Sequence, residues 1–192
     1  DREFGKAVIN FYGSNEGISL FATPATAPQP EVRATMFPRP AADAAIATKV
    51  ADPESGLELR GEGERGELLI GGATVFDGYL GHDNSDVFSA DGFFRTGDLV
   101  EICGEQGNYY RIVGRCKDII NRGGMKISPA ELDVALEQHP QLLEAAVCAY
   151  PDERLGEKIC ACLVARPGSA PPSLQSLPDY LQQQGLARFK MP

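Results

Sequence analysis

Residues 114–133 read GRCKDIINRGGMKISPAELD, and this stretch decides the fold because two patterns meet in it. Before it, short apolar segments alternate with turns; after it, helices and longer strands are predicted. Within it, KDIIN (117–121) and MKIS (125–128) predict two short strands around an Arg-Gly-Gly turn. We therefore expect two domains, residues 1–114 and residues 115–192.

The same stretch is basic, although the chain as a whole is acidic. Its four cationic residues are Arg115, Lys117, Arg122 and Lys126. It does not fit the GxxxxGK[ST] phosphate loop, because no glycine stands at the required distance before a Gly-Lys-Ser/Thr. The residues alone leave several interpretations open: a phosphate cradle of another kind, a nucleic-acid patch, a solvated strand pair with a turn, and a hinge between two working parts.

The residues after the turn predict a small α+β domain. SPAELDVALEQHP (128–140) fits a helix with Ser128 as N-cap, Pro129 at the first helical position and Glu131 at the third. Two strands and a weaker helix are predicted beyond it: EAAVCAYPD (144–152), KICACLVAR (158–166) and SLQSLPDYLQQQG (173–185). Strands and helices packed around one core define an α+β unit.

The residues before the turn predict a mostly antiparallel β-unit. AVINFYG (7–13) is interpreted as a buried strand that runs into a turn, and the Ala-, Pro- and Thr-rich residues 22–47 as loops. Four more strands are predicted between turn residues: ATKVAD (47–52), GELLIGG (66–72), GDLVEIC (97–103) and NYYRIVG (108–114). The fold class predicted for the whole chain is α+β.

The composition excludes several classes of protein. With 18 Lys and Arg against 27 Asp and Glu, the net charge is −9, which argues against a nucleic-acid partner because such proteins carry a basic stripe. The chain has no apolar run of about 18 residues, so no transmembrane segment is expected. The cysteines are odd in number and form no CxxC pair, so we expect no disulfide framework and no zinc site, but small buried thiols in a reducing cytoplasm. They are Cys103, Cys116, Cys148, Cys160 and Cys162.

Two short segments are candidate ligand loops. FYGSNEG (11–17) is either a plain turn or a loop whose backbone N–H groups meet phosphate while Glu16 holds Mg²⁺. In FFRTGDL (93–99), Asp98 either accepts backbone hydrogen bonds within a turn or accepts two hydrogen bonds from a ribose diol. Neither segment decides between its two interpretations alone.

The order of the segments resembles the adenylate-forming superfamily, which includes acyl- and aryl-CoA synthetases, aryl-acid–AMP ligases, peptide-synthetase adenylation domains and luciferases. FYGSNEG is similar to its aromatic-Gly-x-Thr-Glu motif, and FFRTGDL to its Tyr/Phe-Arg-Thr-Gly-Asp motif. GERGELLIGGATVFDGYLG (63–81) looks like its Gly-Glu strand and Gly-Tyr segment, and residues 114–133 are similar to the signature that joins its two domains. The resemblance implies the end of a large domain followed by a small α+β C-terminal lid domain.

The resemblance also implies a role for each matching residue. Tyr12 would stack on adenine, Glu16 would ligate Mg²⁺, and Asp98 would accept both ribose hydroxyls. Lys117 would be the hinge about which the lid domain turns. Asn15 stands where the family has threonine, and its amide would donate to a phosphate in place of the hydroxyl. The other positions implied to contact nucleotide or pantetheine are Gly13, Arg115, Gly123, Gly124 and Lys126.

The implied reaction joins a carboxylic acid to a thiol. The acid attacks the α-phosphate of ATP with the help of Mg²⁺, which gives an acyl-adenylate and releases pyrophosphate. The thiol of coenzyme A then attacks the acyl carbon, which forms the thioester and releases AMP. We expect an acyl-CoA synthetase; the alternatives are an aryl-acid–AMP ligase that loads a phosphopantetheine carrier protein, and a non-catalytic binding module. The family's phosphate loop and adenylation lysine do not occur in these residues, so the chain alone is expected to be inactive. An unpaired edge at residues 7–13 would favour a homodimer.

Overall fold

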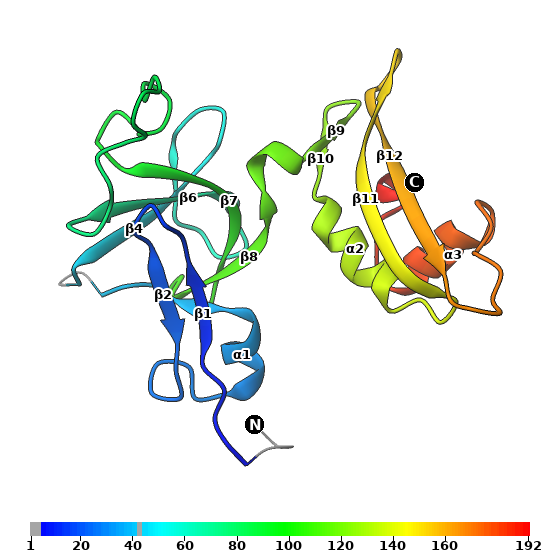
Figure 1. Ribbon diagram of the computed structural model, residues 1–192, viewed down its shortest axis with the longest axis horizontal. Helices are drawn as coiled ribbons and strands as arrows, with labels where there is room; N and C mark the ends of the chain where they lie inside the picture. The colour runs from blue at the N-terminus through cyan, green and yellow to red at the C-terminus, as the bar shows by residue number, and fades with distance from the viewer. Residues whose placement is uncertain (1–4, 42–43) are drawn as a thin grey trace. The chain divides into compact units, whose positions relative to one another are not determined.

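The computed structural model describes residues 5–41 and 44–192, and the chain divides into two compact units, Asp1–Ile112 and Val113–Pro192. The division lies close to the boundary predicted after Gly114. Each unit has its own β-structure (Figure 1). Each also has its own hydrophobic core. That the two units are the large-domain end and the lid domain of a synthetase stays a prediction.

The first unit is built on a six-stranded sheet with the spatial order β3-β8-β7-β6-β4-β5. The strands are β3 (Phe37–Pro38), β4 (Ile46–Ala51), β5 (Glu58–Leu59), β6 (Arg65–Gly72), β7 (Phe94–Cys103) and β8 (Tyr109–Arg115). The pairs β4–β6 and β6–β7 are antiparallel, and Leu68, Ile70, Val100 and Ile102 bring alternate apolar side chains into one core. The four strands predicted between residues 47 and 114 are confirmed.

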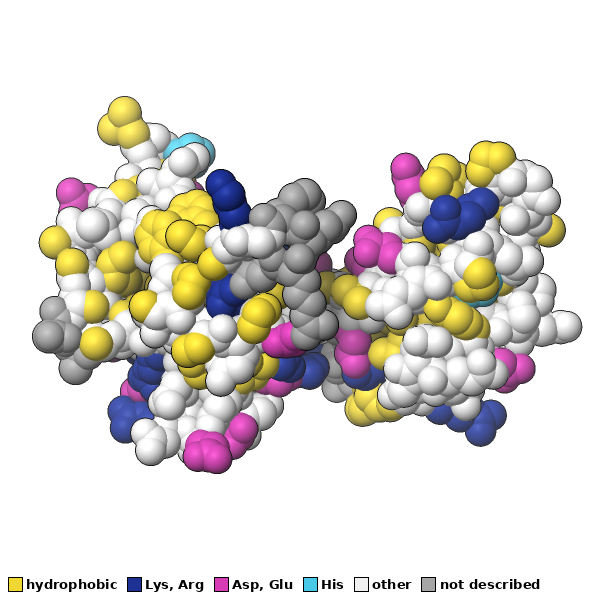
Figure 2. Space-filling model, turned by 90° about the horizontal axis from the view of Figure 1, so that it is seen from below, with side chains coloured by type: hydrophobic (Ala, Val, Ile, Leu, Met, Phe, Trp, Pro, Cys, Tyr) yellow, Lys and Arg dark blue, Asp and Glu magenta, His cyan; other side chains and the backbone are white. Residues whose placement is uncertain are grey.

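A separate antiparallel ribbon consists of β1 (Asn10–Gly13) and β2 (Ser19–Ala22). On its outer side Phe11 and Phe21 are 58% and 52% exposed and contact each other with ring centroids 5.0 Å apart. Figure 2 shows hydrophobic side chains gathered over the first unit on the face drawn. The prediction of a buried strand over residues 7–13 was wrong, because β1 is shorter and only the inner side of the ribbon is covered.

The short helix α1 (Pro30–Thr35) lies in the segment predicted as loops, so that prediction was also wrong. Arg33 anchors the helix to the neighbouring backbone. The residue is 3% exposed, and its guanidinium donates hydrogen bonds to the carbonyl oxygens of Val8 (2.7 Å), Ala27 (2.7 Å) and Pro28 (3.1 Å). Because one buried guanidinium and not an apolar stripe fixes this helix, hydrophobic periodicity gives no sign of it.

The second unit has a four-stranded sheet with the order β10-β9-β12-β11. Its elements are β9 (Ile120–Arg122), β10 (Met125–Ile127), α2 (Pro129–Glu137), β11 (Leu142–Asp152), β12 (Gly156–Ala165) and α3 (Ser176–Gln183). Leu132 and Leu136 of α2, Val147, Ile159 and Leu181 of α3 share one core. The predicted strands over residues 125–128, 144–152 and 158–166 and both helices are confirmed. The strand predicted over residues 117–121 was wrong in its first half, because Cys116–Asp118 form a 3-10 helix and β9 begins only at Ile120. No helix in the described part of the chain is long and apolar enough to cross a membrane.

The start of α2 differs in detail from the predicted cap. Ser128 has the backbone conformation of an N-cap, but its hydroxyl donates to the carbonyl oxygen of Val113 (2.6 Å) and makes no cap hydrogen bond. Glu131 pairs with Lys190 at 2.5 Å and does not reach back to the N-cap. The expected side-chain cap was wrong because both side chains found partners from elsewhere in the chain.

Candidate functional site

Two predicted site residues meet although 86 positions separate them. Tyr12 in β1 donates a hydrogen bond from its hydroxyl to Oδ2 of Asp98 in β7, and both side chains are half-buried. The ring of Tyr12 contacts Phe37 at 5.8 Å between centroids. Thr96 Oγ1 accepts the Asp98 N–H (3.0 Å) and donates to the Leu68 carbonyl (2.7 Å), which holds the backbone of Asp98 within β7, where the pairing with β6 is irregular. An aromatic face beside a fixed carboxylate suits a nucleoside, with its flat base and ribose diol.

An ion pair between half-buried Arg95 and buried Glu67 holds the irregular part of β7 that carries Asp98, a segment predicted from the sequence to be a turn. Arg95 donates from Nε (2.9 Å) and Nη2 (2.7 Å) to Oε2 of Glu67, which is 4% exposed. The other carboxylate oxygen accepts the N–H of Gly97 at 3.1 Å. Both residues lie in motifs singled out from the sequence, Arg95 in FFRTGDL (93–99) and Glu67 in GERGELLIGG (63–72), but their pairing was not predicted. Nothing in the sequence indicated it beyond the opposite charges of the two residues.

Glu16, the predicted magnesium ligand, lies half-buried in the loop after β1. The Tyr79 hydroxyl donates to Oε1 of Glu16 at 2.8 Å, and the Glu16 carbonyl accepts the N–H of Phe76 at 3.0 Å. Gly17 has φ +110°, and a Cβ there would lie 1.9 Å from the carbonyl oxygen of Thr74. The loop is thus fastened to the segment after β6. Sequence reasoning missed the role of Tyr79, although it noted the Gly-Tyr pair as part of the resemblance.

The other two predicted positions of this loop are Gly13 and Asn15. A Cβ on Gly13 would lie 2.4 Å from the end of the exposed Phe11 ring, which can move, and 3.0 Å from the Ile18 carbonyl, so the position is crowded but local packing alone does not require a glycine. Asn15 is exposed at the tip of the loop, where its amide is accessible to a ligand. Their contact with a nucleotide stays a prediction.

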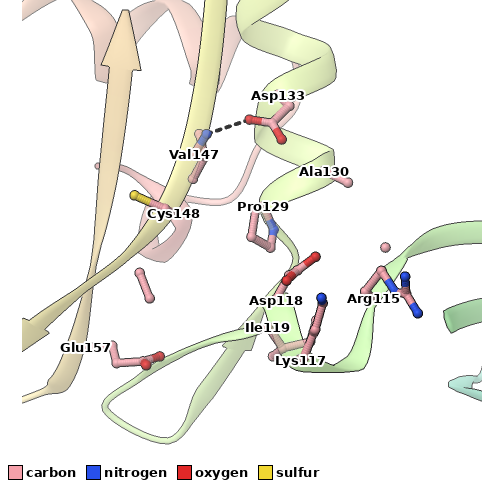
Figure 3. A pocket seen from close by; sticks show the side chains of 12 residues that line it. Arg115, Lys117, Asp118, Ile119, Pro129, Ala130, Asp133, Val147, Cys148 and Glu157 are labelled. Carbon is pink, nitrogen blue, oxygen red and sulfur yellow. Dashed lines mark hydrogen bonds between the residues drawn. The ribbon is translucent and has the colours of Figure 1, made fainter. Parts of the chain in front are cut away.

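The second unit contains a cavity of about 450 Å³ beside the predicted hinge. Figure 3 shows Lys117 and Asp118 of the short 3-10 turn on one side of it and Val147 and Cys148 of β11 on the other. Asp133 on α2 accepts the N–H of Val147 at 2.7 Å. Burial raises the pKa of the Asp133 carboxyl, although the bond from Val147 opposes that shift. The cavity therefore combines a cation, carboxylates and apolar walls within one unit.

The remaining predicted residues gather around the β9–β10 turn. Gly123 and Gly124 have φ +58° and +84°, as a two-residue hairpin turn of type I′ requires, and nothing lies within 4 Å of a Cβ built on Gly124. Lys126 and Arg115 are exposed on β10 and at the end of β8. Arg122 has a structural role, since Nη1 donates to the carbonyl oxygens of residues 189 and 191 at 3.0 and 2.7 Å.

The cysteines differ from their prediction as small buried thiols. Only Cys103 is buried, and burial raises the pKa of its thiol. Cys116 and Cys160 are half-buried, and Cys148 and Cys162 are exposed. The prediction was wrong because β11 and β12 alternate, and their cysteines fall on the side that faces away from the core.

Known proteins resemble this chain in sequence and in fold. Residues 131–192 match the family model described as the AMP-binding enzyme C-terminal domain. The salicyl-AMP ligase / salicyl-S-ArCP synthetase of Mycobacterium tuberculosis is 42% identical over 134 residues, which cover 69% of this chain and 23% of that protein. The mitochondrial medium-chain acyl-CoA ligase ACSF2 of Danio rerio is 32% identical over 202 residues, which cover 99% of this chain and 32% of that protein. The crystal structure of ATP-bound MatB from Rhodopseudomonas palustris matches with a TM-score of 0.81 at 33% identity over 98% of this chain and 36% of that chain.

The chain belongs to the adenylate-forming enzymes, as the domain match, the relatives and the shared fold agree. The predicted α+β fold class is confirmed. The chain spans about a quarter to a third of the length of the relatives it matches.

Proposed function

We propose that the first unit supplies the nucleoside half of an AMP-binding site in an AMP-forming acid–thiol ligase. The observation that carries this proposal is the hydrogen bond between Tyr12 and Asp98. A carboxylate has acceptor capacity for about four hydrogen bonds, so the bond from Tyr12 is compatible with two more from a ribose diol. The same bond holds the Tyr12 ring beside the carboxylate, where an adenine can stack on it.

Glu16 fits the role of magnesium ligand in this proposal. In phosphate-transfer sites Mg²⁺ is held by one or two carboxylates together with substrate phosphates, and Tyr79 already fixes the Glu16 carboxylate in one orientation. Bound Mg²⁺ would offset the negative charge that accumulates when an acid approaches a phosphate. Asn15 at the exposed tip of the same loop would donate its amide to a phosphate oxygen.

The second unit would serve the thiol step. Lys117 lies in an exposed 3-10 turn between β8 and β9, which is a suitable place for a hinge because few backbone bonds would break when it rotates. The turn of Gly123 and Gly124 has open space where side chains would otherwise stand, so a thin pantetheine arm could pass close to its backbone. Arg115 and Lys126 add exposed cations that suit phosphate groups.

Of the two thiol acceptors, we propose a carrier protein, with an aryl acid as the activated substrate. The support is sequence similarity: the chain is 42% identical to a salicyl-AMP ligase / salicyl-S-ArCP synthetase and 32% identical to a medium-chain acyl-CoA ligase. This reverses the order of our sequence-based expectation, which put coenzyme A and the acyl-CoA synthetases first. Coenzyme A remains the second candidate because the acyl-CoA ligase matches 99% of the chain. The homodimer and the cytoplasmic location stay predictions.

Isothermal titration with AMP and with ATP–Mg²⁺ tests the nucleoside half-site. We expect Asp98→Ala to weaken AMP binding at least tenfold, since a hydrogen bond to a charged group contributes about 1.5–3 kcal/mol. Tyr12→Phe keeps the ring and removes one neutral donor, so we expect only about a two- to tenfold loss. Asp86→Asn, at an exposed position of the same unit, is the matched control for charge and should not change the affinity.

AMP binding that is equal in wild type and Asp98→Ala would contradict the proposed site. The acceptor is tested separately, by titrating the same chain with a phosphopantetheinylated aryl carrier protein and with coenzyme A. Binding of coenzyme A without binding of the carrier would favour the acyl-CoA branch and leave the nucleoside site untouched.

A further inference from the structure

Three cysteines converge on the solvent-facing side of the β11–β12 hairpin, outside the proposed nucleotide site. Cys148 in β11 lies directly opposite Cys160 in β12, and Cys162 follows two residues later on the same face of β12. The three Sγ atoms all lie within 4.8 Å of one another. The inward neighbours Val147 and Ile159 are buried in the core, so the strand alternation fixes the opposite orientation of the thiols.

The register of the hairpin disfavours a disulfide between the two opposite cysteines. The N–H of Val147 donates to Asp133 on α2 and therefore points away from β12. In an antiparallel pair this orientation alternates, so Cys148 and Cys160 form a hydrogen-bonded pair. Such pairs hold their Cβ atoms about 5.5 Å apart, whereas a disulfide requires about 3.5–4.5 Å. The strands would have to move before an S–S bond could form.

Separations of this size suit a metal ion shared by three sulfurs. Zn²⁺ binds thiolate at about 2.3 Å with tetrahedral angles, which places neighbouring sulfurs about 3.8 Å apart. Closing the gap from 4.8 Å or less requires an inward shift of about 1 Å at most, which side-chain rotation on a rigid sheet provides. A solvent molecule would take the fourth position, because the site lies at the surface.

We propose that Cys148, Cys160 and Cys162 form a three-thiolate site for a thiophilic d¹⁰ cation such as Zn²⁺. Binding replaces three S–H bonds by three metal–sulfur bonds and releases the protons to the solvent. Partial burial and the neighbouring sulfurs raise the pKa of the Cys160 thiol, and a bound cation offsets this crowding of negative charge. The bound ion would cross-link β11 to β12 beside the cavity that Cys148 also lines.

Titration of the reduced chain with Cd²⁺ under anaerobic conditions tests the site, because cadmium–thiolate bonds absorb in the near ultraviolet. We expect one equivalent of metal per chain and a band that scales with three thiolates. Cys148→Ser, Cys160→Ser and Cys162→Ser should each remove about a third of the band. Each should also lower the affinity for Zn²⁺, measured by competition with a chelator. The loss should exceed the roughly 10- to 100-fold effect of removing a residue that only hydrogen-bonds to a metal ligand. Cys116→Ser, a half-buried thiol outside the cluster, is the matched control and should change neither value.

A second measurement needs no variant and is therefore independent of folding defects. Zn²⁺ should protect the three clustered cysteines from alkylation together, as mapped by mass spectrometry, while Cys116 continues to react at its metal-free rate. Independent reaction of the three thiols in the presence of Zn²⁺ would overturn the proposal, as would a cadmium band that keeps its full intensity in each of the three serine variants.

Discussion

Replacing Arg95 by methionine would leave the Glu67 carboxylate buried without its cation. Removing one partner of a fully buried ion pair destabilises a protein by about 3–5 kcal/mol. Here the Arg95 side chain is 37% exposed and Glu67 would keep the N–H of Gly97, so water and one donor compensate in part. We therefore expect a loss of about 2–3 kcal/mol in the free energy of unfolding of the first unit.

Hydrogen exchange measured by mass spectrometry resolves this loss, because it reports each unit separately. Peptides from β6 and β7 should exchange roughly 30- to 150-fold faster in Arg95→Met, whereas peptides from β11 and β12 should be unchanged and so form an internal control. Arg65→Met is the matched variant: Arg65 pairs with Glu101 at 2.7 Å, and Glu101 would keep its second partner Arg111.

For the more exposed Arg65 pair we expect a loss below about 1 kcal/mol. If Arg95→Met and Arg65→Met accelerate exchange equally, the reasoning that burial makes the Arg95 pair important is refuted. The same experiment has a functional readout, because Arg95 and Glu67 hold the part of β7 that carries Asp98. AMP affinity should fall in Arg95→Met and not in Arg65→Met.

Two further variants test the packing of the sites. Gly17→Ala should destabilise the first unit by at least about 2 kcal/mol in thermal unfolding, because Gly17 has φ +110° and an added Cβ would meet the Thr74 carbonyl. Gly63→Ala is the control: Gly63 has φ +80° with nothing within 4 Å of an added Cβ, so only about 1–2 kcal/mol of stability should be lost. Equal losses in the two variants would contradict the steric argument. Burial raises the pKa of Asp133 above its unfolded value, so its charge destabilises the fold at neutral pH and this effect disappears as the pH falls below the unfolded pKa. Asp133→Asn should therefore be more stable than wild type at pH 7 in urea unfolding and lose that advantage near pH 3; a constant difference between the two pH values would disprove the electrostatic origin.

Much of the fold followed from local patterns in the sequence. Alternating apolar residues and turn glycines predicted the strands β4, β6, β7 and β8, because both signals act over a few neighbouring residues. The motif resemblance predicted that Asp98, Glu16 and Tyr12 would be site residues. The structure places Tyr12 against Asp98 and gives Glu16 a partner in Tyr79.

The features that the sequence did not reveal depend on contacts between distant segments. Helix α1 depends on the three backbone bonds of Arg33, and the Arg95–Glu67 pair joins residues 28 positions apart. Two of the clustered cysteines stand at strand spacing in the sequence, but Cys148 joins them only through the register of the hairpin. A register is set by the turn and by the buried face, and neither is visible in a cysteine count.

The exposed outer face of the β1–β2 ribbon has a consequence for nucleotide affinity. Leu20 and Ala22 anchor the ribbon in the core, but two strands with two solvent-facing phenylalanines have less support than six, so we expect the ribbon to open more readily than the sheet. Tyr12 belongs to that ribbon and Asp98 to the sheet, so only the closed fraction of molecules presents both to a ligand. The apparent dissociation constant for AMP equals the intrinsic constant divided by that fraction. Any partner surface that covers Phe11 and Phe21 would therefore tighten AMP binding without touching the nucleotide.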